Sequence, residues 1–208
     1  MNKKKVMIGV PTLFPYIHTN FWKSWMKLAK PNGHMVMVST GSITSVARNK
    51  IVEYARHHKC SHVMFLDSDM TFPQDAIQKL MTHDKDIVCG LYFQRDPPHL
   101  PASIIGETER ISKEMINSGR LQEIDANGTG CMLIKTEVFD KMGYPWFDYQ
   151  VYKGYKYYTE DVIFCRKAKK LGFRIFVDTS IKCGHIVDYE LSESDYKEVK
   201  ENGIKDGQ

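Results

Sequence analysis

One stretch decides the fold of this chain: His62-Val63-Met64-Phe65-Leu66-Asp67-Ser68-Asp69. Its first five residues are mostly apolar and have the length of a buried strand, and two carboxylates follow with one residue between them. Residues i and i+2 of an extended chain point the same way, so we expect Asp67 and Asp69 to face one spot at the end of a strand. Open α/β sheets bind their ligands outside the carboxyl ends of their strands.

The elements around this stretch alternate between strand and helix. The sequence predicts strands over 5–11, 35–39, 62–66 and 86–93, and helices over 20–29, 45–57 and 75–82 between them. Strands separated by helices of this length form βαβ units. We therefore expect an α/β fold with a Rossmann-like, mostly parallel central sheet flanked by helices.

The second half has a different pattern. A proline-rich connection over 96–101 leads to predicted strands over 102–105, 121–125, 131–135 and 174–178, with helices over 136–142 and 159–171. We expect a smaller, partly antiparallel second-half sheet there. With 208 residues the chain has the length of a single domain. It divides into halves of about 1–95 and 96–187, and a polar tail over 188–208 follows.

Composition excludes several classes of protein. Hydrophobic residues make up 42% and charged residues 26%, which is typical of soluble globular chains, and no apolar run is long enough for a transmembrane segment. A net charge of +4 is too small to indicate a nucleic-acid partner. The five cysteines are odd in number, widely spaced and without a Cys-x-x-Cys pair, which favours reduced thiols in a cytoplasmic compartment.

Three polar sites are candidates for chemistry. Because close carboxylates repel each other, Asp67 and Asp69 suit a manganese or magnesium ion, although a polar turn would also contain them. In Thr159-Glu160-Asp161 the threonine is expected to cap a helix, and either acid is a candidate general base or only a partner of the helix dipole. His185 is a candidate metal ligand or a structural histidine.

Two further segments have two interpretations each. The glycines of Asn127-Gly128-Thr129-Gly130 allow backbone to approach a ligand, or make a turn before a strand. The stretch 144–158 holds six of the eleven tyrosines without a regular period. It is interpreted as a loop that stacks on a sugar-like ligand, or as a hydrophobic cluster under a long loop.

Taken in order, these residues resemble GT-A fold glycosyltransferases, in particular the large inverting family 2-type group in a compact single-domain form. The matching pieces are Val10-Pro11-Thr12, Ala47-Arg48-Asn49, Phe65-Leu66-Asp67-Ser68-Asp69, Gly128-Thr129-Gly130-Cys131-Met132-Leu133-Ile134 with Val138-Phe139, Glu160-Asp161 and His185. Compact members occur in bacteria and large DNA viruses, and some are one domain of a longer polypeptide. The expected location is the cytoplasm, that of the host if the chain is viral.

This resemblance implies a donor site in the first half for a nucleoside diphosphate sugar, with UDP-sugar as the expected donor. Pro11 and Thr12 would lie near the nucleoside, Arg48 near the diphosphate and Ser68 beside the donor. Asp69 and His185 would be manganese or magnesium ligands, and Asp67 would hold ribose or a metal-bound water.

The resemblance also implies an acceptor site in the second half for a glycan or glycoconjugate. Asp161, or Glu160 beside it, would be the base for a transfer with inversion. Gly130, Trp146, Tyr149 and Tyr158 would contact the acceptor. The acidic residue that holds uracil in many relatives is absent, and Ser39-Thr40-Gly41-Ser42 stands in its place.

Two other functions compete with this interpretation. Asp67-Ser68-Asp69-Met70-Thr71 also matches the Asp-x-Asp-x-Thr signature of haloacid-dehalogenase-like phosphohydrolases, although that signature normally follows the first strand of its domain. A glycan-binding module without catalysis would use the aromatic stretch and would not need the carboxylates.

Overall fold

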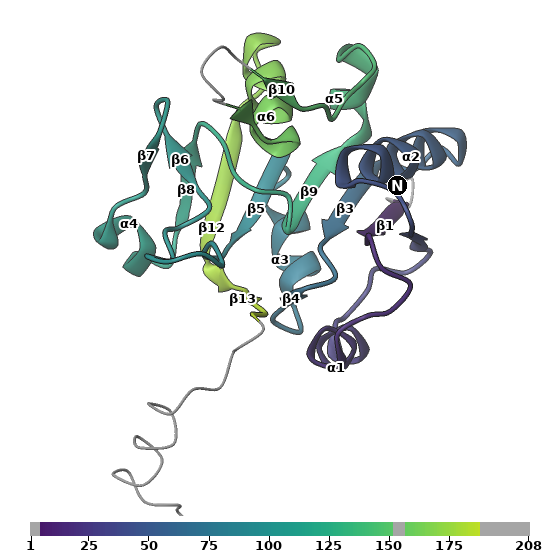
Figure 1. Ribbon diagram of the computed structural model, residues 1–208, viewed down its shortest axis with the longest axis horizontal. Helices are drawn as coiled ribbons and strands as arrows, with labels where there is room; N and C mark the ends of the chain where they lie inside the picture. Colours follow the sequence, from purple (N-terminus) through teal and green to yellow (C-terminus); the bar gives the residue numbers. More distant parts are fainter. Residues whose placement is uncertain (1–4, 152–156, 188–208) are drawn as a thin grey trace, which may run out of the picture.

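The computed structural model describes residues 5–151 and 157–187; the predicted polar tail and Tyr152 and Tyr155 of the aromatic stretch lie outside these residues. A seven-stranded sheet forms its centre. The strands of this sheet are β1 (Val6–Pro11), β2 (Met35–Ser39), β3 (His62–Leu66), β5 (Ile87–Leu91), β8 (Leu121–Ile124), β9 (Cys131–Lys135) and β12 (Ile175–Lys182). Their order across the sheet is β2-β1-β3-β9-β5-β12-β8 (Figure 1).

The sheet is mixed but mostly parallel, as predicted. β1 pairs in parallel with β2 and β3, and β5 pairs in parallel with β12. β9 lies antiparallel between β3 and β5, and β8 is antiparallel to β12. Three of the four predicted second-half strands, which correspond to β8, β9 and β12, therefore belong to the central sheet and do not form a sheet of their own.

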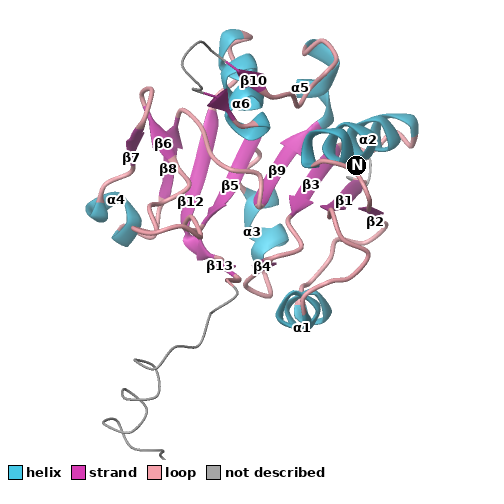
Figure 2. Cartoon of the chain, viewed as in Figure 1, coloured by secondary structure: helices cyan, strands magenta, loops and turns pink. Residues whose placement is uncertain are grey.

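Six helices and three small ladders complete the described residues (Figure 2). The helices are α1 (Thr19–Lys27), α2 (Thr44–His57), α3 (Ala76–Thr82), α4 (Lys113–Asn117), α5 (Thr136–Lys141) and α6 (Glu160–Lys170). The antiparallel ladders pair β4 (Met70–Thr71) with β13 (Gly184–His185), β6 (Ile104–Ile105) with β7 (Glu109–Arg110), and β10 (Gln150–Val151) with β11 (Tyr157–Tyr158). None of the described helices has the length and apolar character to cross a bilayer.

Helices cover both faces of the sheet, which explains why its central strands are apolar throughout. Phe65 packs in a core that contains residues of α2, α5 and α6, such as Phe139 and Phe164. Its neighbours Met64 and Leu66 point to the other face, into a core that contains residues of α1 and α3. All five cysteines are buried and free.

This topology gathers several chain ends at one edge of the sheet. The carboxyl ends of β1, β3 and β5 meet there, and the segment before the antiparallel β9 joins them. Residues that follow or precede these strands are distant in sequence but line one region. The edge is the ligand-binding edge that the sequence predicts for an open α/β sheet.

Candidate functional site

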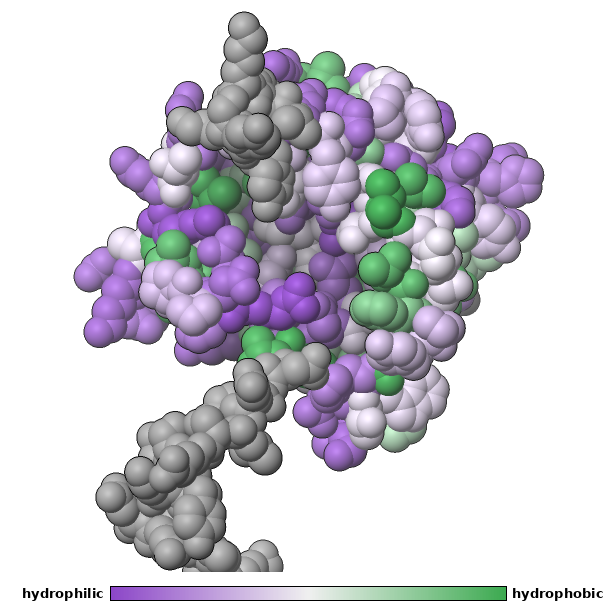
Figure 3. All heavy atoms as spheres, in the orientation of Figure 1, coloured by the Kyte–Doolittle hydropathy of each residue, from purple (hydrophilic) through white to green (hydrophobic). Residues whose placement is uncertain are grey.

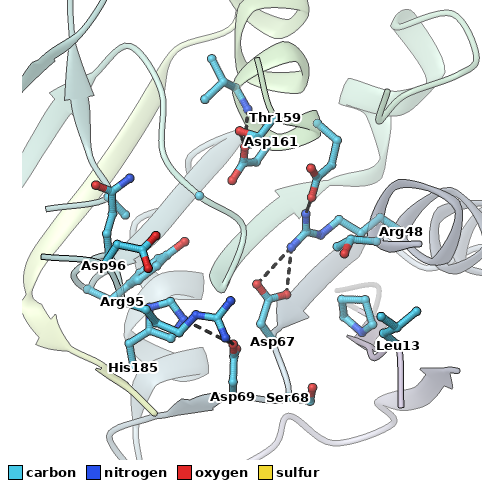
Figure 4. A pocket seen from close by; sticks show the side chains of 18 of the residues that line it. Leu13, Arg48, Asp67, Ser68, Asp69, Arg95, Asp96, Thr159, Asp161 and His185 are labelled. Carbon is cyan, nitrogen blue, oxygen red and sulfur yellow. Dashed lines mark hydrogen bonds and ion pairs between the residues drawn. The ribbon is translucent and has the colours of Figure 1, made fainter. Parts of the chain in front are cut away.

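A cavity of about 940 Å³ opens at this edge, seen as the hollow in the middle of Figure 3. Residues of both halves line it. The predicted site residues in its wall are Pro11, Thr12, Arg48, Asp67, Ser68, Asp69, Tyr158, Glu160, Asp161 and His185. The structure therefore brings the two carboxylate pairs, the arginine and the histidine around one space (Figure 4).

The two aspartates after β3 share this cavity but bind different partners. The strand ends at Leu66, and the chain then turns, with the Met70 amide donating to the Asp67 carbonyl at 3.2 Å. The segment is therefore not extended as expected, and the two side chains face one cavity but have different partners. Asp67 points to Arg48, whereas Asp69 lies beside Arg95 and His185 (Figure 4).

Arg48 joins two carboxylates that come from distant elements. Its Nη2 donates to both oxygens of Asp67, at 2.9 and 3.0 Å, and its Nη1 pairs with Glu160. Burial raises the pKa of Asp67; the positive charge of Arg48 opposes this, and the charge of Asp69 adds to it. The guanidinium predicted to lie at the diphosphate is thus buried and holds Asp67 and Glu160 together.

Asp69 is paired with two cationic or titratable side chains. Its Oδ2 lies 3.2 Å from Nη1 of Arg95 and 3.4 Å from Nε2 of His185. Burial opposes ionisation of the carboxyl group. The hydrogen bond and charge of His185 and the charge of Arg95 nevertheless lower the pKa of Asp69. Despite burial, the same contact with Asp69 raises the pKa of His185.

The other ring nitrogen of His185 fixes its orientation. Nδ1 lies 2.8 Å from the carbonyl oxygen of Phe93. A carbonyl only accepts hydrogen bonds, so Nδ1 carries the proton of the neutral ring and Nε2 presents its lone pair to Asp69. A carboxylate oxygen and a bare ring nitrogen then face each other, which is favourable only with a cation between them or a proton on Nε2.

Asp161 is fixed through one of its oxygens at the start of α6. Oδ1 accepts from the Val162 amide at 2.7 Å and contacts the Thr159 hydroxyl. Thr159 holds the N-cap position, but its side chain makes no capping hydrogen bond, contrary to the predicted cap. Oδ2 accepts no hydrogen bond from any described residue. It lies close to Gly128, since a β-carbon added to that glycine would be 3.2 Å from Oδ2.

Glu160, the neighbour of Asp161, is buried, and other side chains already contact its carboxylate. Its carboxylate pairs with Arg48 and is in hydrogen-bond contact with Tyr149. Burial raises the pKa of Glu160; Arg48 opposes this and Asp161 adds to it. Burial and the charge of Glu160 raise the pKa of Tyr149 to about 12. Of the two acids, Asp161 has the oxygen that is open to the cavity.

The predicted acceptor residues separate into two groups. Tyr158 lines the cavity, with the guanidinium of Arg166 3.7 Å from the ring centre. Trp146 is only 4% exposed and donates from Nε1 to the Phe139 carbonyl at 2.9 Å, so it belongs to the core. Gly130 also lies outside the lining; its amide donates to the Tyr92 hydroxyl.

Tyr92 and Arg95 are among the residues of the cavity wall that the sequence-based site does not include. Tyr92 is buried with its hydroxyl beside Gly128 and Gly130, and Arg95 pairs with Asp69. Both follow β5, whose carboxyl end meets the same edge as the end of β3. The rule that places ligands at the carboxyl ends of strands would have identified them.

Comparison with known proteins identifies the family. The sequence model of Glycosyl transferase family 2 matches residues 22–143, more than half of the chain. No curated protein sequence matches.

Solved structures with this fold include proteins of low sequence identity. A197 from STIV matches 88% of this chain and 86% of its own length, with 19% identity and a TM-score of 0.66. GalNAc-T7, crystallised with UDP, GalNAc and Mn2+, matches 91% of this chain with 13% identity and a TM-score of 0.59. S. aureus TarS 1-349, crystallised with UDP-GlcNAc, matches 94% with 18% identity and a TM-score of 0.53.

This chain spans 45% of the GalNAc-T7 chain and 64% of the TarS chain. Because the identities are low, these structures show the fold alone. The fold and the family model agree with each other. The chain therefore belongs to Glycosyl transferase family 2 and is a glycosyltransferase of the GT-A fold.

Proposed function

We propose that this chain transfers a sugar from a nucleoside diphosphate sugar, expected to be a UDP-sugar, to a hydroxyl group of a glycan or glycoconjugate with inversion. The observation that carries the proposal is that one cavity holds Asp69 and His185 on one side and the open oxygen of Asp161 on another (Figure 4). The ligands of GalNAc-T7 and TarS support the choice of donor. The family match removes the ground for the phosphohydrolase alternative.

The donor set suits a divalent metal ion. Among the described residues no three carboxylate, imidazole or thiol side chains form a ready metal site, but Asp69 and His185 offer an oxygen and a nitrogen that face each other. The Phe93 carbonyl orients His185 as backbone carbonyls orient metal-binding histidines. Asp69 and His185 would hold Mn2+ or Mg2+, with Asp67 binding through water or to ribose. When bound, the ion stabilises negative charge on a leaving diphosphate.

Asp161 is the proposed general base. Its Oδ1 is held by Thr159 and the Val162 amide, so Oδ2 keeps a fixed direction toward the cavity. Oδ2 would accept the proton of the acceptor hydroxyl as that oxygen attacks the anomeric carbon. Attack on the face opposite the leaving diphosphate inverts the configuration. Glu160 would hold Arg48 and so position Asp67.

The two halves of the domain would hold different substrates. In the first half, about 1–95, Pro11, Thr12 and Ser68 line the cavity beside the proposed donor site. In the second half, about 96–187, Tyr158 would contact the acceptor from the cavity wall; Tyr149 lies outside the lining and contacts Glu160. The cytoplasmic location stays a prediction.

Calorimetric titration of UDP and GDP with and without Mn2+ tests the donor site. We compare the wild type with Asp69→Ala and with Asp75→Ala, an exposed aspartate paired with Lys79. Metal-dependent binding of one nucleotide that only Asp69→Ala removes supports the proposal. Binding of a free glycan without any nucleotide binding would favour the glycan-binding module.

A further inference from the structure

The surface beside the mouth of the cavity exposes large apolar side chains together with lysines. The connection from β1 to α1 carries Leu13, Phe14 and Tyr16, and α1 carries Trp22 and Met26; all five are 50% to 66% exposed. We call these residues, with Lys23 and Lys27, the α1 surface. Figure 3 shows apolar side chains to the right of the central hollow; in Figure 1 the connection from β1 descends on this side to α1, at the bottom of the view. Single exposed apolar residues are ordinary, but a group of this size indicates a contact surface.

Helix α1 is fixed to the protein through its inner face. Phe21 is buried in the core, with its ring edge against Phe72, and Ser24 exchanges hydrogen bonds with the Phe72 backbone at 2.7 and 3.1 Å. Residues 22, 23, 26 and 27 follow helical spacing and share the outer face. The helix therefore presents two apolar side chains and two lysines outward on a rigid support.

The charge of this region has one sign. The first acidic residue of the chain is Glu53, and before it stand seven lysines and Arg48. This segment therefore carries a formal charge of +8, and because the whole chain has +4, the rest of the chain is net acidic. Lys23 and Lys27 form no ion pair with any described residue, and Asp75, which follows the strand packed against α1, is paired with Lys79.

We propose that the α1 surface docks on an anionic lipid membrane. Trp22 and Met26 would enter the boundary between headgroups and acyl chains, and Lys23 and Lys27 would contact lipid phosphates. Exposed aromatic residues beside lysines suit this boundary, whereas the centres of protein interfaces are depleted in lysine. Leu13, Phe14 and Tyr16 also line the cavity, so docking would bring its mouth to the membrane surface.

Co-sedimentation with lipid vesicles tests this proposal without any sugar donor. The vesicles are phosphatidylcholine alone, or phosphatidylcholine mixed with phosphatidylglycerol, at low and high salt. The test variants are Lys23→Gln with Lys27→Gln, and Trp22→Ser with Met26→Ser. The matched controls remove exposed residues elsewhere: Lys113→Gln with Lys141→Gln, and Tyr144→Ser with Leu171→Ser.

We expect the wild type to bind only the anionic vesicles and to bind them less tightly at high salt. Each lysine removed should lower the affinity about fivefold. The serine variant should also lose binding, while both controls keep it. Brominated lipid should quench the wild-type fluorescence more than that of Trp22→Phe, which still contains Trp25 and Trp146.

The proposal would be overturned if brominated lipid quenched the wild type and Trp22→Phe equally. It would also be overturned if the test variants kept their binding, or if the wild type did not bind anionic vesicles. If the wild type bound no vesicles but self-associated in the ultracentrifuge, and Trp22→Ser with Met26→Ser abolished this self-association, the surface would be assigned to a second copy of the chain.

Discussion

Nη2 of Arg48, on α2, donates to both carboxylate oxygens of Asp67, just past the end of β3, at 2.9 and 3.0 Å. The same side chain pairs with Glu160 at the start of α6, and it is almost fully buried. One guanidinium therefore fixes three separate elements around the cavity. Its Nε has no hydrogen-bond partner among the described residues, so the two carboxylates are the contacts that compensate its burial.

Replacing Arg48 with methionine should destabilise the protein strongly. The variant leaves buried Glu160 and partly buried Asp67 close together without a counter-charge, and such losses cost about 3–5 kcal/mol. Urea unfolding measures the change. Arg56→Met on the same helix is the control, because Arg56 and Asp140 form an exposed ion pair worth about 1 kcal/mol or less. Equal losses for the two variants would contradict this account.

Gly128 leaves no room for a side chain. A β-carbon there would lie 2.0 Å from the hydroxyl of Tyr92, which is buried and cannot swing away. We expect Gly128→Ala to lower the free energy of unfolding by about 1–3 kcal/mol and to reduce transfer. Adding Tyr92→Phe should recover much of the stability, since it removes the clashing oxygen. Gly143→Ala, with no atom within 4 Å of the new carbon, is the neutral control.

Much of the fold could be predicted from the sequence because the central strands are buried on both faces. Continuous apolar runs gave the bounds of β3 and β9 as the structure has them. The bounds of β2 were also predicted, although it is an edge strand with Val36 and Val38 exposed. The position of β9 between β3 and β5 could not be predicted, because strand pairing depends on contacts far apart in the chain. The two-residue strands are too short to show a period.

The candidate site was predictable in its residue types but not in their partners. Asp67, Asp69, Asp161 and His185 stand out by type and by position at the ends of elements, and all line the cavity. That Arg48 pairs with Glu160, far away in sequence, follows only from the folded structure, which brings α2 and the start of α6 to the same cavity. Trp146 shows the opposite problem: an aromatic residue suits a sugar site and a core equally well, and here it lies in the core.

A buried carboxylate outside the site should make stability depend on acid. Asp178 accepts hydrogen bonds from the Ser180 amide at 2.8 Å and from His83 Nε2 at 2.7 Å. Burial opposes them, but together they lower the pKa of Asp178. The unfolded chain therefore binds the proton of Asp178 more readily than the folded protein does. The ionised carboxylate contributes its full share to the free energy of unfolding above the unfolded pKa of about 3.9, and this share is lost as the pH falls through the lower pKa of the folded protein.

Urea unfolding as a function of pH measures this effect. Asp178→Asn should be less stable than the wild type at neutral pH, and the difference should shrink below about pH 4. Asp75→Asn, an exposed residue paired with Lys79, should follow the wild type throughout. A difference for Asp178→Asn that stays constant with pH would show that its charge does not contribute.

The two adjacent acids of α6 should separate by their effects. Asp161→Asn keeps the size of the side chain and its contact with Thr159 but removes the proton acceptor, so we expect kcat to fall by about 10²- to 10⁴-fold with nucleotide affinity unchanged. Glu160→Gln removes a partner of buried Arg48, so we expect a loss of stability measured by urea unfolding. Asp140→Asn on the surface is the control for both measurements. If Glu160→Gln loses transfer while remaining stable, and Asp161→Asn retains it, then Glu160 is the base and the open oxygen of Asp161 has no part in the reaction.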